Sequence, residues 1–212
     1  MKSALLTSIA LLTLSSFAAA QTDSPASGPP ATEAPATQTV APEPSVPVEE
    51  GLAAWDTVYA VASHPRCANC HVGPDNIPVW SGPSYGARQP HGMHVSGGES
   101  RIGAEFIQCQ TCHMETQTGE PHAAPGAPEW HLAPVEQQWI DKSSAEICHQ
   151  FKDPARNGGR SLEEMALHVR DDKLVAWGWK PGGNREPAPG SAEETYQAIE
   201  TWAAAGAPCP DS

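Results

Sequence analysis

The sequence predicts a mostly α-helical domain with extensive irregular loops. Three segments begin with a serine that is followed three residues later by a glutamate, the capping-box pattern that satisfies free backbone N–H groups at a helix start. They cover residues 143–151, 161–169 and 191–206, and Gly206 is expected to end the last helix. A further helix is predicted over 53–63 from an apolar stripe of helical period. Residues 72–134 are rich in Gly, Pro and Ser, which indicates loops with little core of their own.

The N-terminal fifty residues predict an exported protein with a spacer. Residues 1–20 have a basic start at Lys2, an apolar run over 4–14 and small residues before Gln21, which is typical of a cleaved secretory signal peptide. An uncleaved membrane anchor is the alternative, but polar residues interrupt the run. Residues 21–50 contain seven prolines, five acidic residues, no basic residue and no aromatic residue, so a disordered linker is expected.

Residues 51–212 have the length of one domain, with an expected division into 51–134 and a helical region over 135–212. The formal net charge of the chain is −13, which makes nucleic acid a poor partner because binding it requires a basic face. No stable membrane span is expected once the signal is removed, and the predicted location is the bacterial periplasm. Cysteines in that oxidising compartment can pair.

Two C-x-x-C-H motifs carry the chemistry, RCANCHVGP over 66–74 and QCQTCHMET over 108–116. Four cysteines could form a zinc ribbon, but 38 residues separate Cys70 from Cys109, where about 15 to 20 are usual. A redox dithiol is the second alternative, although no βαβ pattern surrounds either motif. Neither alternative needs a histidine directly after each second cysteine.

Covalent haem attachment needs all three residues, because two thiols bind one edge of the porphyrin and the histidine binds the iron. We therefore predict two haem c groups. The cysteines that bind them are Cys67, Cys70, Cys109 and Cys112, and the proximal iron ligands are His71 and His113. We call residues 67–71 the first attachment motif and 109–113 the second. The predicted fold is accordingly one of short helices around two covalent haems, whose apolar faces replace the missing core over 72–134.

The distal iron ligands are left open by the sequence. His91 and Met93 share one side of a glycine-rich loop and are the candidates for one haem. His64 and His168 are the candidates for the other, since His64 could reach a neighbouring haem and His168 stands on a predicted helix. Two ligands on each iron would favour electron transfer over catalysis.

Cys148 and Cys209 remain after the two motifs, and we predict that they form a disulfide. Free thiols are the alternative. Between them, Trp177 and Trp179 alternate around Gly178, which would place both indoles on one face of an extended segment.

The strings HPRCANCH, PHGMHV, CQTCH, ICHQFKDPARNGGR, LVAWGWKPGGNREPAPG and GAPCP resemble a family of small exported dihaem c-type cytochromes. Some of its members are named as subunits associated with isoquinoline 1-oxidoreductase, a molybdenum hydroxylase. The resemblance implies electron transfer from a partner oxidoreductase to the respiratory chain, and a need for cytochrome c maturation machinery. The order His64, first motif, His91, second motif is also similar to the dihaem small subunit of periplasmic nitrate reductase, in which both irons have histidine pairs.

We therefore expect a dihaem electron carrier and not an enzyme. The alternative is a small haem enzyme of peroxidase or reductase type, or a haem-based gas sensor, with one iron open to a ligand. Such an enzyme would use His168 or His122 as its acid/base group.

Overall fold

The computed structural model describes residues 44–104, 107–115 and 123–211. The predicted signal peptide, the linker up to residue 43 and His122 lie outside these ranges. The described part is mostly helical with long loops, as predicted. Its α-helices are α1 (Val48–Ala62), α2 (Pro65–Ala68), α3 (Ser144–Lys152), α4 (Leu162–Asp171), α5 (Lys173–Ala176) and α6 (Ala192–Ala204).

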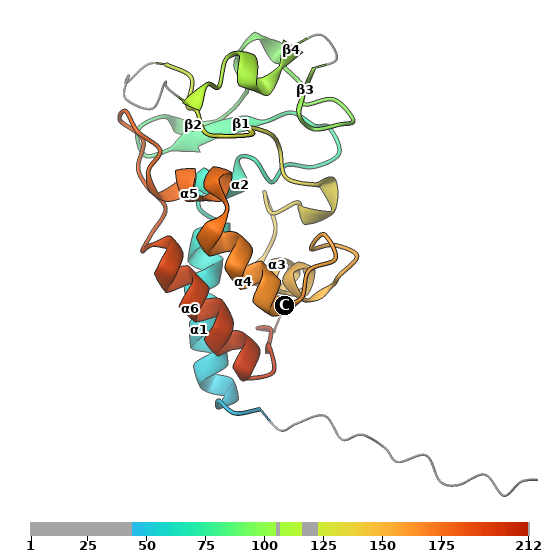
Figure 1. Cartoon of the computed structure of the whole chain (residues 1–212), viewed down its shortest axis with the longest axis vertical. Helices are drawn as coiled ribbons and strands as arrows, with labels where there is room; N and C mark the ends of the chain where they lie inside the picture. Colours follow the sequence, from blue (N-terminus) through green and yellow to red (C-terminus); the bar gives the residue numbers. More distant parts are fainter. Residues whose placement is uncertain (1–43, 105–106, 116–122, 212) are drawn as a thin grey trace, which may run out of the picture. The chain divides into compact units, whose positions relative to one another are not determined.

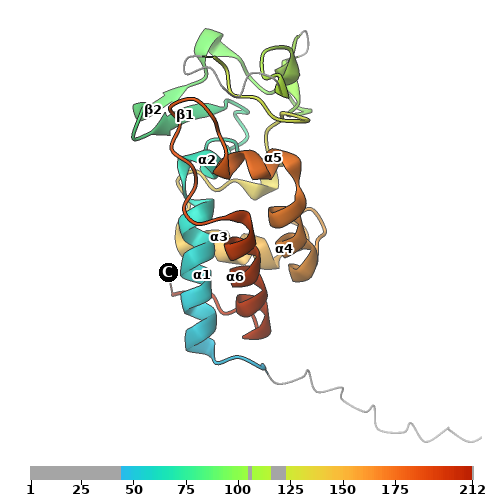
Figure 2. The same ribbon diagram turned by 60° about the vertical axis from the view of Figure 1, so that its left-hand side comes forward.

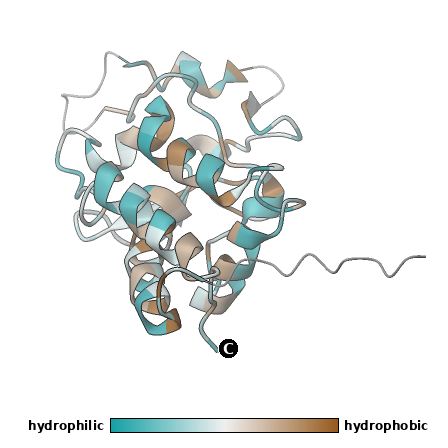
Figure 3. Ribbon diagram, turned by 60° about the horizontal axis from the view of Figure 1, so that its bottom comes forward, coloured by the Kyte–Doolittle hydropathy of each residue, from teal (hydrophilic) through white to brown (hydrophobic). Residues whose placement is uncertain are grey.

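Helices α1, α3, α4 and α6 pack together and form what we call the helical half (Figures 1 and 2). Its core centres on Trp55, whose ring lies 4.9 Å from that of Trp202 and 5.3 Å from that of Phe151. Helices in Figure 3 carry hydrophobic and hydrophilic residues side by side, and α1, α3, α4 and α6 each contribute buried hydrophobic residues to the core. The predicted disulfide is present: Cys148 of α3 is bonded to Cys209, with the two Cα atoms 5.7 Å apart.

The predicted serine caps are present at all three helix starts. Ser143 and Ser161 form complete capping boxes with Glu146 and Glu164. The hydroxyl of Ser191 accepts the N–H of Glu194 and donates to the Glu194 carboxylate, but the N–H of Ser191 does not donate to that carboxylate as a capping box requires. The φ angle of Ser191 is −145°, against −69° and −67° at the other two caps, which turns its N–H away from the glutamate.

Helix α1 begins at Val48, so its first turn falls on the last three residues of the predicted linker. This segment is tied to α6: the N–H of Ser45 donates to the carbonyl of Ala204 at 3.1 Å. Gly51 lies so close to α6 that an added Cβ would lie 2.4 Å from the Cβ of Ala205. Contacts with α6 therefore stabilise the first turn of α1, which precedes the apolar stripe that predicts a helix over 53–63.

The described residues between 72 and 134 form what we call the loop half, most of which lies toward the upper end of Figure 1. It contains two small antiparallel sheets that the sequence analysis does not predict, β1 (Val79–Gly82) with β2 (Gly86–Pro90), and β3 (Gly103–Ala104) with β4 (Ile107–Gln108). The buried Arg101 holds the loops together by donating to the carbonyls of Val72 and Gly73 and to the side chain of Asn76.

Trp177 and Trp179 are predicted to lie on an extended segment, but the structure places them on a helical one. Asp172 caps α5, and the chain continues directly into a 3-10 helix over Trp177–Trp179. Helices α2 and α5 lie between the loop half and the helical half (Figure 2). Within the described ranges, no helix combines the length and apolar character that crossing a membrane requires.

Candidate haem-binding sites

The first attachment motif begins on α2. His64 caps this helix by accepting the N–H of Arg66 on Nδ1 at 3.2 Å, and Pro65 occupies its first position. The turn continues beyond Ala68, since the N–H of Cys70 donates to the carbonyl of Cys67 at 3.1 Å. One helical turn thus carries both thiols, and both line the same cavity.

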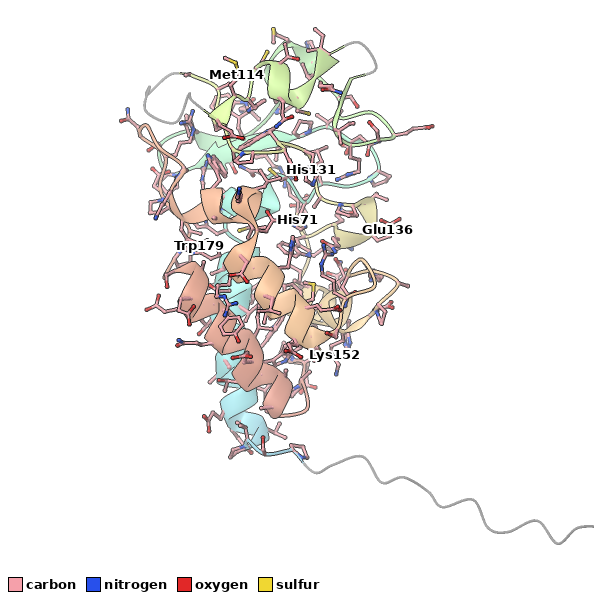
Figure 4. All side chains as sticks on the ribbon, in the orientation of Figure 1. His71, Met114, His131, Glu136, Lys152 and Trp179 are labelled. Carbon is pink, nitrogen blue, oxygen red and sulfur yellow. A yellow bond between two sulfur atoms is a disulfide. The ribbon has the colours of Figure 1, made fainter. Side chains whose placement is uncertain are left out.

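This first cavity has a volume of about 220 Å³ and lies between α2, α4 and α5. Its lining includes Cys67, Cys70 and His71 together with Met165 and His168 of α4. The structure therefore brings one of the candidate distal ligands, His168, to the same cavity as the first attachment motif. In Figure 4, His71 and His131, which also lines this cavity, lie between the strands above and the helices below.

His71 is held in the form that binds metal. Its Nδ1 lies 2.7 Å from the carbonyl oxygen of Gln137, and because that oxygen only accepts, Nδ1 must carry the proton. The lone pair is then on Nε2. The ring stacks on Trp139 with centroids 3.4 Å apart and planes 6° apart, which fixes its orientation. Burial lowers the pKa of His71 to about 3, so the ring stays neutral.

The thiols of the first motif do not have the properties of a redox dithiol. Reactive C-x-x-C pairs have lowered thiol pKa values. Here burial raises the pKa of Cys67 to about 12 and that of Cys70 to about 11, and neither is disulfide-bonded. A zinc site is not assembled either: among the described residues, no group of three or more His, Cys, Asp or Glu is placed to hold a metal ion.

The second attachment motif repeats the arrangement of the first. Cys109 starts a short 3-10 helix, and the N–H of His113 donates back to the carbonyl of Cys109 at 3.0 Å. The Nδ1 of His113 lies 2.6 Å from the carbonyl oxygen of Pro125, and its ring stacks on Trp130 at 4.7 Å with planes 3° apart. Burial lowers the pKa of His113 as well.

A glycine allows this contact. Gly126 follows Pro125 and packs on the backbone of Met114, the residue after His113. A Cβ at Gly126 would lie 1.8 Å from the carbonyl oxygen of Met114. Only glycine therefore lets the loop bring the Pro125 carbonyl to His113, and Figure 4 shows Met114 in the upper part of the structure.

The second cavity has a volume of about 600 Å³ and contains Cys109, Cys112 and His113 in its lining. His91 and Met93, the two candidates in the glycine-rich loop, both line it. The ring centroid of His91 lies 5.8 Å from that of His113. An imidazole nitrogen lies about 2 Å from a bound transition metal and the centroid about 1 Å further, so two rings that share an iron have centroids roughly 6 Å apart.

The candidate distal histidines differ in which ring nitrogen is free to bind a metal. Nδ1 of His91 lies 2.8 Å from the carbonyl oxygen of Gly92, and Nδ1 of His168 lies 3.4 Å from the carboxylate of Asp172, so both can present an unprotonated Nε2. His64 is in the opposite state, because its Nδ1 accepts a hydrogen bond and the proton must be on Nε2. His64 is also absent from the lining of both cavities.

Five residues line both cavities, and we call them the shared wall. They are Arg66, Cys70, Trp130, His131 and Trp177. The sequence analysis does not predict this wall. The rings of Trp130 and Trp177 meet edge to face at 4.9 Å, so the tryptophan stacked on His113 also reaches the cavity of the first motif.

The residues present fit a large apolar cofactor. Trp80, Met93 and Ile107 are exposed large hydrophobic residues of the described part, and all three line the second cavity. A porphyrin in that cavity would cover them. Comparison with models of known protein families, with curated proteins and with solved structures finds no match for this chain. The assignment of the sites therefore depends on the geometry of the chain itself.

Proposed function

We propose that this chain is a dihaem c-type cytochrome that transfers electrons between redox proteins outside the cytoplasm. The observation that supports the proposal most strongly is a repeated geometry. Each attachment motif places its histidine with Nδ1 on a backbone carbonyl and its ring on a parallel tryptophan. Besides His131, which lines both cavities and has its Nδ1 on the carbonyl of Glu129, each cavity contains one further histidine whose Nδ1 is occupied: His168 in the first and His91 in the second.

In the proposed holoprotein, Cys67 and Cys70 hold one haem, with His71 and His168 as the iron ligands. Cys109 and Cys112 hold the other, with ligands His113 and His91. Haem iron, when bound, supplies a one-electron couple whose potential depends on its ligands and surroundings. The role of this chain is to fix the imidazoles so that little moves when the charge of the site changes.

His91 is preferred to Met93 because its ring lies at the separation from His113 that a shared metal requires. Met93 is 83% exposed and has a φ of 59°, and nothing holds its sulfur in place. His168 is preferred to His64 because it lines the first cavity and can present an unprotonated Nε2. His64 lines neither cavity, and its Nε2 carries the proton. Met165 lies in the first cavity too, but it is only 3% exposed and belongs to the core of the helical half.

We further propose that the protein works in the periplasm and depends on cytochrome c maturation machinery. The predicted signal peptide and the two attachment motifs support this location. The resemblance of the motif sequences supports a partner oxidoreductase, of molybdenum hydroxylase type, as the electron donor and the respiratory chain as the acceptor. The proposed protein has no substrate of its own and is not an enzyme.

The test is an optical spectrum of the purified protein, made in cells with the maturation machinery and recorded in the oxidised and reduced states. We expect two covalent haems by mass spectrometry, both low-spin, and no spectral change on adding carbon monoxide to the reduced protein. A variant with Cys109→Ala and Cys112→Ala is the matched control and should retain one haem. A chain without haem would contradict the proposal, and a high-spin iron that binds carbon monoxide would favour an enzyme or sensor.

A further inference from the structure

The two cavities are positively charged although the chain is acidic. Formal net charge is −13, yet the second cavity is lined by Arg66 and Arg185 and by no Asp or Glu among the described residues. The first cavity is lined by Arg66 and Arg160, with Asp172 as its one described acidic residue. Buried cations are costly without a compensating anion. We therefore expect a bound molecule with negative charge to compensate the arginines of these cavities.

Arg66 and Trp177 of the shared wall have donors without acceptors. Arg66 is 7% exposed, and its Nη2 donates to the carbonyl of Ser81 at 2.6 Å, but its Nε has no partner in the described structure. The Nε1 of Trp177 is likewise buried and unpaired there. The guanidinium carbon of Arg66 lies 5.9 Å from the ring centroid of Trp177.

Glu186 attracts the charge of Arg66, but it does not satisfy these donors, and its own Oε2 is buried without a hydrogen-bond partner in the described structure. Glu186 accepts a hydrogen bond from the hydroxyl of Ser84. Among the described residues, it makes no ion pair with Arg66 within 4.0 Å. A buried donor without an acceptor is destabilising, and more so when it belongs to a charged group, so two such donors on one wall indicate a binding site for an acceptor.

We propose that Arg66 and Trp177 bind a carboxylate of a haem, one of its propionates, at the wall between the two cavities. This inference rests on the proposed function. A carboxylate has two oxygens that only accept, so one group can satisfy both the Arg66 guanidinium and the Trp177 N–H. These two residues then position the haem and influence its reduction potential, because a nearby cation and hydrogen bonds stabilise the electron-rich reduced state.

The first experiment compares two tryptophan variants of the haem-loaded protein by spectroelectrochemistry. Trp177→Phe removes the unpaired N–H and keeps a ring in the wall. Trp179→Phe is the matched control, since the N–H of Trp179 already donates to the carbonyl of Pro189 at 3.0 Å. We expect Trp177→Phe to lower the midpoint potential of one haem and Trp179→Phe to leave both potentials unchanged. Equal potentials in Trp177→Phe and the parent would overturn the assignment of Trp177.

The second experiment tests the charge. Arg66→Gln should lower a midpoint potential and shift the propionate bending band in the resonance Raman spectrum, and Arg66→Lys should restore most of the potential. Arg88→Gln is the control, because Arg88 is an exposed partner of Asp141. An unshifted Raman band in Arg66→Gln would overturn the proposal even if the potential moves, since a general field effect would explain the potential alone.

A carboxylate from outside the protein is the other source of the same chemistry. The holoprotein is therefore titrated with acetate, and we expect no saturable change in its spectrum or potential. A saturable change that Arg66→Gln abolishes would overturn the proposal and show an external carboxylate site. Haem content is measured first for every variant. A parent without haem refutes the proposed function, whereas six-coordinate haems with unchanged potentials and Raman bands refute only this inference.

Discussion

The two carboxylate oxygens of Asp172 have different roles, and a single substitution separates them. Oδ1 caps α5 by accepting the N–H groups of Leu174 at 2.8 Å and Val175 at 3.1 Å. Oδ2 lies 3.4 Å from Nδ1 of His168. Asparagine caps a helix as well as aspartate does. Asp172→Asn therefore keeps the cap and removes the negative charge that faces the proposed iron ligand.

The expected effect can be estimated. Loss of the partner that orients a metal-binding histidine typically costs about 10–100-fold in affinity. His168 and Asp172 are 30% and 37% exposed at their side chains and the contact is long, so the lower end applies. We expect about tenfold, or ~1.4 kcal/mol. Because the proposed haem would be covalently attached, this loss should be observed as easier replacement of His168 by an external ligand.

Carbon monoxide titration of the reduced holoprotein measures this replacement. Asp172→Asn should bind the gas at one of its two haems, since His168 would be displaced about tenfold more readily than in the parent, which should show no spectral change at the same gas concentration. Asp171→Asn is the control, since Asp171 pairs with Arg170. Thermal unfolding checks that the cap survives. Identical carbon monoxide binding by Asp172→Asn and the parent, or an equal effect of Asp171→Asn, would refute the role assigned to Asp172.

Three other changes test the remaining features. His91→Ala should let carbon monoxide bind the second haem while Met93→Ala behaves as the parent, and gas binding by Met93→Ala alone would reverse the ligand assignment. The double change Cys148→Ala and Cys209→Ala opens a loop with a separation of 61 residues. It should lower the free energy of unfolding by about 4 kcal/mol in urea titrations, and a loss below about 1 kcal/mol would contradict the loop-closure argument. Replacing all four cysteines of the attachment motifs by alanine should leave the helical half resistant to limited proteolysis and open residues 72–134 to cleavage. Equal cleavage in both halves would show that they unfold together.

The features that depend only on neighbouring residues, namely the turns of the two motifs and the serine caps, could be predicted from the sequence. Each C-x-x-C-H motif forms a single turn whose shape depends on a few adjacent residues. The same holds for the serine caps, which satisfy donors three residues away. The disulfide between Cys148 and Cys209 is predictable for a different reason, because these are the two cysteines that remain outside the motifs in a chain predicted to be exported.

The partners of the proximal histidines could not be predicted, because their positions depend on the tertiary fold. Trp139 follows His71 by 68 residues, whereas Trp130 follows His113 by 17 residues. No common spacing therefore relates the two stacks. His168 is 97 residues beyond His71, and only the packing of α4 brings it to the first cavity. For His64, the sequence could not reveal that its Nδ1 accepts a hydrogen bond from the chain.

The two halves of the structure obtain their stability in different ways. Every residue of the main hydrophobic core belongs to residues 55–62 or to residues 147–207, within the helical half or beside it. The described residues of the loop half bury only Val72, Ala127 and Leu132 as hydrophobic side chains, while Trp80 and Ile107 stay exposed. Those exposed side chains line the second cavity.

This division indicates which part of the chain would depend on the proposed cofactors for folding. The helical half has its own buried core and a disulfide, so it has no need of a porphyrin to bury apolar surface. The loop half has no such core, and the apolar faces of the proposed haems would serve as one. Attachment and folding are then coupled mainly over residues 72–134. This segment carries the second motif and begins directly after the first, so the proposed haems would be attached where the chain's own packing is weakest.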